Sequence, residues 1–189
     1  GQKVVGSKIS IDCDCLGMSG GWTPAVHLFT QSGGKLKFRD EDQVFIPDTY
    51  PSDQISIGSC NGEFTLDEIL SSISKKLKDF LNIKKTEYEN LEIQSHFNKT
   101  KRNIWLLPSD KIIGKTKPFV DYQNDATAKD IKLALREGFR SIEHVKRYTT
   151  TGMGTDQGKL GNMHALGIIS ETAGSKMGEL GTTTFRPPY

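Results

Sequence analysis

The order of apolar and polar side chains divides the chain into a strand-rich first part and a helical second part. Residues 8–16 alternate apolar and polar positions, the period of two that is typical of a β-strand. A glycine-rich turn at 17–22 and a short helix over 24–29 follow, the helix with proline in its first turn. The pattern then predicts three more short strands, over 35–38, 44–47 and 54–57.

Apolar residues spaced three and four apart begin in the middle of the chain. They predict a helix of about Leu66–Leu81, led by Thr65 and Asp67. Residues 82–118 are polar and weakly periodic. We therefore interpret them as a surface helix and a connector, which end in an exposed hydrophobic piece at 104–108.

Beyond a boundary near residue 115 the chain shows only helix and turn signals. Thr127 and Asp130 form a capping box at a helix start, and Gly138 is placed to end that helix. Ser141 caps the next helix, and a third covers Gly161–Ser170. The expected core positions on these helices are Ile131, Leu133, Ala134, Leu135, Ile142, Val145, Tyr148, Met163, Leu166, Ile168 and Ile169.

Composition narrows the class of protein. The 189 residues include 35% hydrophobic and 25% charged positions, an ordinary globular balance. A net charge of +2 does not indicate a nucleic-acid or membrane partner, and neither a signal peptide nor an apolar run of about 20 residues is present. Cys13, Cys15 and Cys60 favour reduced thiols in a cytoplasmic protein. Both ends read as cut, so we expect a fragment of a longer polypeptide.

The sequence does not indicate metal, nucleophile or DNA-reading chemistry. The four histidines have no common spacing with carboxylates. A helix–turn–helix at 127–149 carries basic residues, but interspersed acidic residues dilute its basic face and argue against DNA binding.

Two glycine-rich turns are candidate anion sites. Residues 58–62 join a predicted strand to a predicted helix, where amides and the helix dipole favour phosphate. An ordinary strand-to-helix turn is the alternative, and without a Gly-x-Gly-x-x-Gly fingerprint the main dinucleotide site would lie upstream. The segment 146–159 has three glycines, three consecutive threonines and a single carboxylate. It is either an anion cradle or a structural turn between helices.

Several segments resemble a known family. Residues 119–131 and 138–159, with the run Lys-Arg-Tyr-Thr-Thr-Thr-Gly-Met-Gly, are similar to the alpha subunit of heterotetrameric sarcosine oxidase. The resemblance covers nearly the whole chain and is weakest at 75–115. Three further segments share it, at 20–28, 31–35 and 181–189, the last reading Gly-Thr-Thr-Thr-Phe-Arg-Pro-Pro-Tyr.

The resemblance implies an α/β fold. It would be the terminal part of a dinucleotide-binding (disulfide-oxidoreductase-like) domain, followed by a small all-helical module. Residues 1–115 would be the C-terminal part of the NAD-binding region, with a variable helical or connector segment at 75–115. Residues 116–178 would be the helical module, and 179–189 a linker toward a folate-binding domain.

The resemblance also implies a function for the assembled enzyme. The family's holoenzyme oxidatively demethylates sarcosine to glycine, forms hydrogen peroxide and passes the methyl carbon to tetrahydrofolate. Its beta subunit carries FAD and covalent FMN, with FMN at the alpha–beta interface. The implied partners are the beta, gamma and delta subunits, with no nucleic acid and no membrane. No residue here resembles the amine-oxidising catalyst, so the fragment alone is expected to be inactive.

The helical module further resembles the bacterioferritin-associated-ferredoxin type of [2Fe-2S] domain. That pattern has a Cys-x-Cys before its first helix and two more cysteines around the Gly-Met-Gly loop. The corresponding positions here are Asp121, Gln123, Asp156 and Gly161. Because thiolates hold such clusters, the resemblance predicts a module without an iron–sulfur cluster.

The resemblance implies a minor NAD contact at the first glycine turn and an FMN-side surface at residues 149–157. A non-catalytic subunit-docking module is one alternative, and a helical electron-transfer domain of another amino-acid oxidase is a second. No catalytic and no metal-binding residue is expected. The candidate cofactor-binding residues are Gly58, Ser59, Phe64, Leu66, Thr150, Thr151, Gly152, Gly154, Thr155 and Gln157.

Overall fold

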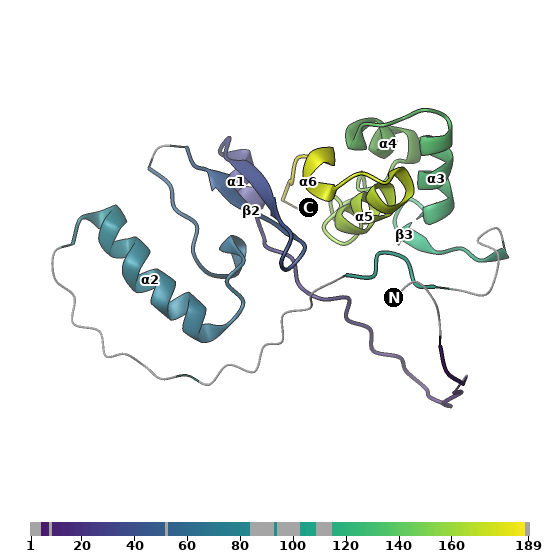
Figure 1. The fold of residues 1–189 in the computed structure, drawn as a ribbon, viewed down its shortest axis with the longest axis horizontal. Helices are drawn as coiled ribbons and strands as arrows, with labels where there is room; N and C mark the ends of the chain where they lie inside the picture. Colours follow the sequence, from purple (N-terminus) through teal and green to yellow (C-terminus); the bar gives the residue numbers. More distant parts are fainter. Residues whose placement is uncertain are drawn as a thin grey trace.

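The computed structural model describes residues 5–7, 9–51, 53–83, 93, 103–108 and 115–187. It is a mixed helix and strand structure, with a small hairpin and one long helix in the first half and a group of short helices in the second (Figure 1). In chain order the elements are α1 (His27–Gln31), β1 (Lys35–Arg39), β2 (Val44–Thr49), the 3-10 helix η1 (Gly58–Asn61), α2 (Leu66–Leu81), β3 (Phe119–Asp121), β4 (Ala126–Thr127), α3 (Ala128–Arg136), α4 (Ile142–Thr149), α5 (Asn162–Ala173) and α6 (Met177–Leu180).

The first sheet is the antiparallel hairpin of β1 and β2, in which Phe38 lies opposite Phe45. The predicted strands at 35–38 and 44–47 are therefore confirmed. The short helix α1 packs its buried Phe29 against the turn that leads into β1. A Cβ atom on Gly34 would approach the Phe29 ring to 2.4 Å, so this turn requires glycine. The same ring meets Tyr50 edge to face at 5.0 Å between centroids.

Helix α2 has the bounds that its apolar spacing predicts. It begins with a capping box, because the Thr65 hydroxyl accepts a hydrogen bond from the Glu68 amide while the Glu68 carboxylate accepts one from the Thr65 amide. It ends at Asn82, which adopts the left-handed conformation. None of its residues is buried within the described chain. No helix in the described ranges has both the length and the apolar character that crossing a bilayer requires.

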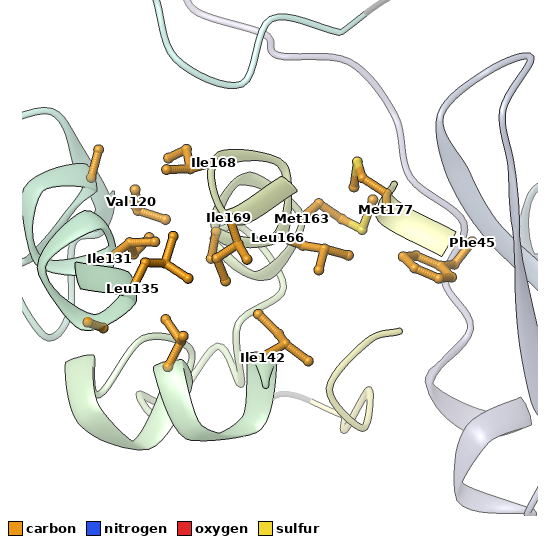
Figure 2. Packing of buried hydrophobic residues seen from close by; sticks show 14 of the residues in the cluster. Phe45, Val120, Ile131, Leu135, Ile142, Met163, Leu166, Ile168, Ile169 and Met177 are labelled. Carbon is orange, nitrogen blue, oxygen red and sulfur yellow. The ribbon is translucent and has the colours of Figure 1, made fainter. Parts of the chain in front are cut away.

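The main hydrophobic core lies between α3, α4 and α5. Figure 2 shows Ile131 of α3 beside Ile169 of α5. Both predicted helix signals for α3 are confirmed, with Thr127 and Asp130 in a capping box and Gly138 at a φ of 98° after the last turn. The buried members of this cluster are Val26, Phe45, Val120, Ala128, Ile131, Ala134, Leu135, Ile142, Val145, Met163, Ala165, Leu166, Ile168, Ile169, Met177 and Phe185.

Residues from the first half of the chain and from its last segment belong to the same core. Val26 and Phe45 join the helical cluster, as do Met177 of α6 and Phe185 of the extended segment that follows. In Figure 2, Met177 and Phe45 form the end of the row of side chains that starts at α3. The hairpin and the helical group therefore share one hydrophobic cluster rather than folding around separate ones.

Two of the predicted strands are wrong. Residues 9–16 form no strand, and Ile9 and Ile11 are 79% and 80% exposed. Residues 54–57 are extended but pair with no other described segment. The alternation of apolar and polar residues indicates only which side chains could share a face. A strand also needs a partner backbone for its hydrogen bonds. The short pair β3–β4, in which Phe119 lies opposite Thr127, was not predicted.

Two further predictions need correction. The piece at 104–108 is not exposed throughout, because Trp105 and Leu106 pack against the helical core. A Cβ atom on Gly167 would lie 2.1 Å from the Trp105 ring, so the indole lies directly on that glycine of α5. Tyr148 is 43% exposed and does not enter the core. Its ring contacts the ring of Phe139 in a tilted arrangement, with 4.9 Å between centroids. The surface helix expected within 82–118 falls mostly outside the described residues.

Candidate functional site

The loop between α4 and α5 is organised around one buried carboxylate, that of Asp121 at the end of β3. Asp121 is only 6% exposed. Its Oδ2 accepts a hydrogen bond of 2.6 Å from the Gly152 amide. Its Oδ1 accepts from the amides of Gln123 and Asn124 at 2.9 and 3.0 Å. The carboxylate therefore ties the glycine loop to the turn that joins β3 to β4.

Hydrogen bonds keep Asp121 ionised despite its burial. Burial alone raises the pKa of a carboxyl group, because it removes water from the charged form. Here the amides of Gly152, Asn124 and Gln123, together with the Asn124 side chain, outweigh burial and hold the pKa of Asp121 below its usual value. At neutral pH a negative charge therefore lies beneath the loop.

A second contact between the same two segments is made by Gln123. Its Nε2 donates to the Thr155 hydroxyl at 2.7 Å, and its Oε1 accepts from the Asp156 amide at 3.1 Å. A Cβ atom on Gly154 would meet the Gln123 side chain at 2.1 Å. Glycine at 154 thus provides the space in which the glutamine amide lies.

The far side of the loop closes on itself through Asp156 and Asn162. The Asp156 carboxylate accepts from the Gly158 amide at 3.1 Å. Asn162, at the start of α5, donates to the Gln157 carbonyl at 3.4 Å. Gly152 and Gly158 have φ values of 71° and 75°, and a Cβ atom on them would lie 2.2 and 2.1 Å from the Asn162 side chain, far inside van der Waals contact. These two positions therefore require glycine for both conformation and space.

The three threonines have different surroundings. Thr149 and Thr151 are buried, and their hydroxyls share a hydrogen bond of 2.8 Å. Thr150 between them is exposed and adopts a φ of 60°, which is unusual for a β-branched residue. Only the middle threonine of the three therefore presents its side chain to solvent.

Of the two interpretations of this loop, an anion cradle or a structural turn, its hydrogen bonds favour the structural turn. The amide of Gly152 donates to Asp121, that of Asp156 to Gln123, and that of Gly158 to Asp156. A phosphate would have to displace these internal acceptors, two of which are negatively charged. Of the candidate residues, Thr151 and Gly152 are buried, whereas Thr150 and Thr155 are exposed and Gly154 and Gln157 are half-buried.

The four positions that correspond to cluster ligands do come together in space. Asp121 and Gln123 share β3 and its turn, Gln123 bonds to the Asp156 amide, and a Cβ atom on Gly161 would lie 2.7 Å from the Val120 carbonyl. The donor set does not fit an iron–sulfur cluster, because it contains no thiolate and its carboxylates are already hydrogen-bonded. Within the described residues no group of histidine, cysteine or acidic side chains is arranged to hold a metal.

The first glycine turn is also occupied by a carboxylate of the chain. Glu63 accepts from the Gly58 amide at 2.9 Å and from the side chains of Asn61 and Ser72 at 2.7 and 2.8 Å. Lys76 of α2 completes the set with an ion pair of 3.1 Å. Burial opposes ionisation, but these hydrogen bonds outweigh it and keep the pKa of Glu63 low.

For the amide of Gly58, the structure therefore favours the ordinary strand-to-helix turn over a dinucleotide phosphate site. That amide has a charged acceptor within the chain, and the amide of Thr65 at the start of α2 donates to Glu68. A phosphate would face two carboxylates here rather than free donors. Ser59 and Leu66 of the candidate set remain exposed at this turn.

The sequence did not predict that Glu63, Asp121, Gln123 and Asn162 organise the two turns, although the resemblance placed Asp121 and Gln123 at cluster-ligand positions. Only one of them had a signal in the sequence. Asp121 precedes Gln123 and Asn124 in a turn, and an aspartate that accepts amides two and three residues ahead is a common turn device. The other three make contacts that span up to 33 residues of chain, which local patterns do not reveal.

The whole chain is similar to known proteins. A family model described as "Sarcosine oxidase A3 domain" matches residues 115–189. The chain is 35% identical over 195 residues to "Sarcosine oxidase subunit alpha" of Rhizobium meliloti (strain 1021), covering 97% of this chain and 19% of that protein. It is 33% identical to the protein of the same name from Corynebacterium sp. (strain P-1), covering 100% of this chain and 20% of that one.

Among solved structures, L-proline dehydrogenase from P. horikoshii is similar, with a TM-score of 0.54. Sequence identity is 21%, and the match covers 89% of this chain and 36% of that one. At this identity the likeness concerns the fold alone, and it agrees with a mixed helix and strand architecture. The chain spans about a fifth of the length of the curated relatives that it matches.

Proposed function

This chain belongs to the family of sarcosine oxidase alpha subunits, and we propose that it forms the central part of such a subunit. The assembled enzyme would oxidatively demethylate sarcosine to glycine, with formation of hydrogen peroxide and transfer of the methyl carbon to tetrahydrofolate. Its partners would be beta, gamma and delta subunits. FAD on the beta subunit, FMN at the subunit interface and tetrahydrofolate in an adjoining domain would carry the chemistry.

We propose that this segment contributes a rigid surface beside FMN. The observation that carries this proposal is the hydrogen-bonded frame of Asp121 and Gln123, which fixes the backbone of residues 149–158 from beneath. Because the amides of Gly152, Asp156 and Gly158 are bonded internally, we expect the loop to contact a ligand mainly through side chains. Thr150, Met153 and Thr155 are exposed on it and could line a neutral, planar part of the flavin.

The first glycine turn would have a smaller role. The carboxylates of Glu63 and Glu68 occupy the amides that a pyrophosphate would need. We therefore propose that Gly58, Ser59, Phe64 and Leu66 contact NAD only through its uncharged parts. The phosphates would be bound elsewhere in the dinucleotide-binding region.

This proposal assigns the segments of the chain as follows. Residues 1–115 would be the end of the dinucleotide-binding region, and 179–189 would lead toward the folate-binding domain. Residues 116–178 would be a helical module in which hydrogen bonds from backbone amides to the side chains of Asp121, Gln123 and Asp156 take the place of a metal cluster.

A test compares Met153→Ala with Leu107→Ala in an assembled enzyme that contains this segment. Met153 is exposed on the loop, and Leu107 is exposed on the connector at 103–108. If the loop faces FMN, Met153→Ala will change the flavin absorption spectrum or its midpoint potential, and Leu107→Ala will not. An assembly that weakens while the flavin spectrum stays unchanged would instead support the docking alternative. Unchanged assembly and an unchanged spectrum would contradict both roles for the loop.

A further inference from the structure

Helix α2 and the extended stretch before it form a strand–turn–helix unit. Residues 54–57 are extended, η1 makes the turn, and α2 follows. The Lys76 ammonium group donates to the Ser56 carbonyl at 3.1 Å, so the helix returns alongside the extended stretch. A Cβ atom on Gly58 would lie 3.8 Å from the Ile69 side chain. The helix therefore rests on its own extended stretch through the side that carries Ile69 and Lys76.

The apolar stripe of α2 lies on a different side of the helix. Successive helical residues are about 100° apart, which places the centre of the stripe roughly a quarter of a turn from the side with Ile69 and Lys76. No residue of α2 is buried within the described chain, and Figure 1 shows the helix apart from the α3–α5 group. Leu66, Phe80 and Leu81 are 55%, 45% and 55% exposed. The members of the stripe are Leu66, Leu70, Ile73, Leu77, Phe80 and Leu81.

The extended stretch beneath the helix is incomplete as well. Neither of the two described sheets includes residues 54–57, and no described residue forms a hydrogen bond with the backbone of Ile55. A strand that leads through a turn into a helix packed on it is the repeating unit of parallel sheets. In such sheets a helix covers its own strand and a neighbouring one. A single further strand beside 54–57 would therefore pair the free backbone and cover the apolar stripe of α2.

We propose that residues 54–57 and the apolar stripe of α2 dock on a parallel β-strand supplied by the part of the alpha subunit outside this chain. The chain spans about a fifth of the length of its curated relatives, and both of its described sheets are antiparallel pairs. The partner strand carries apolar side chains on the face under α2, because strands covered by helices are apolar. This inference rests on the proposed function, which assigns the chain to such a subunit.

The test compares hydrogen exchange of α2 in the 189-residue chain and in an alpha subunit that contains it, by mass spectrometry. The α2 amides should exchange at least about tenfold more slowly in the subunit, because the docked helix opens less often. Exchange in α5 should be the same in both, since the core around Leu166 and Ile169 is complete within this chain. Equal exchange of α2 in the two proteins would overturn the proposal.

Two variants show whether the apolar stripe carries the effect. Leu77→Ser should abolish the added protection in the subunit and leave the 189-residue chain within about twofold of its parent. Lys75→Ser is the matched control, because Lys75 is exposed on the opposite side of α2 and leucine and lysine have similar helix propensities. It should leave the added protection in place. Added protection that persists in Leu77→Ser would overturn the proposal.

Other occupants of the stripe give different results in the 189-residue chain alone. Slow exchange of α2 that increases with protein concentration would show that a second copy covers the stripe. Slow exchange that is lost in Ile11→Asp would show that the exposed apolar residues of 9–16 cover it. Either result would overturn docking on the rest of the subunit.

The flavin test with Met153→Ala separates this inference from the proposed function. A flavin shift in Met153→Ala without added protection of α2 would contradict the docking surface and leave the flavin-facing loop in place. Added protection of α2 with unchanged flavin properties in Met153→Ala would support the docking surface and contradict the flavin-facing role.

Discussion

The two glycine turns of this chain look alike in sequence, and each surrounds a carboxylate of the chain, but with different kinds of hydrogen-bond donors. In each, a glycine with positive φ directs its amide at a carboxylate of the chain, Gly58 at Glu63 and Gly152 at Asp121. Glu63 is satisfied mostly by side chains, including Lys76 of α2. Three of the four hydrogen bonds to Asp121 come from backbone amides.

The difference determines what each carboxylate holds in place. Side chains can change rotamer, so the Glu63 set attaches α2 to its turn but leaves other geometries accessible. Backbone amides cannot move without moving the chain, so Asp121 fixes the shape of the loop itself. A charged group at the centre of a glycine turn also explains why neither turn is a free anion site: the anion is part of the protein. Each prediction below changes one member of this pair.

The largest effect is expected from Asp121→Asn. The amide that replaces one carboxylate oxygen is a donor, and it would face the N–H of Gly152 or those of Gln123 and Asn124. An unsatisfied buried donor together with the lost charge should lower the free energy of unfolding by about 3 kcal/mol. Urea denaturation followed by circular dichroism measures this.

The matched control for that variant is Asp125→Asn. Asp125 is exposed in the same turn with a φ of 53°, a conformation that asparagine also accepts. It should change stability by no more than about 0.5 kcal/mol. Equal destabilisation by the two variants would show that Asp121 does not organise the loop.

The second prediction compares the two glycines directly. Gly152→Ala combines a positive φ with a Cβ atom 2.2 Å from the Asn162 side chain, so it should cost about 2 to 3 kcal/mol. At Gly58 the corresponding Cβ atom meets only Ile69, at 3.8 Å, so Gly58→Ala carries the conformational cost alone, about 1 kcal/mol. Chemical denaturation of both variants gives the difference. A larger loss at Gly58 would contradict the view that the second turn is the more tightly packed.

The third prediction concerns the side-chain set around Glu63. Glu63→Gln removes the ion-pair partner of Lys76 and the charged acceptor of the Gly58 amide. It should lower the free energy of unfolding by about 1 kcal/mol. This loss is smaller than that expected for Asp121→Asn, because the Glu63 side chain is partly exposed. Hydrogen exchange should be faster in the amides of α2 and unchanged in α5. Asp79→Asn, on the exposed end of α2, is the control. Faster exchange in α5 would show that the two turns are coupled.

The sequence predicts those parts of the fold that depend on near neighbours. The bounds of α2 and the capping box at Thr127 follow from spacing over a few residues, and the structure confirms them. The interior of the second turn depends on contacts such as that of Gln123 with Thr155, 32 positions apart. The packing of Trp105 on Gly167 of α5 likewise joins residues 62 positions apart. Composition identifies a glycine turn, but it does not show whether the amides serve a ligand or a carboxylate of the chain.

The smallest effect is the acid dependence that the two carboxylates share. The pKa values of Asp121 and Glu63 are both lowered in the folded chain, so each stabilises it fully only above its unfolded pKa of about 4. As the pH falls through the lower folded pKa, the protons bind and this stabilisation is lost. Unfolding midpoints measured between about pH 5 and about pH 3 should therefore decrease, and less so in Asp121→Asn and Glu63→Gln than in the parent chain. If the two variants lose stability with acid as steeply as the parent, neither carboxylate is held ionised by its glycine turn.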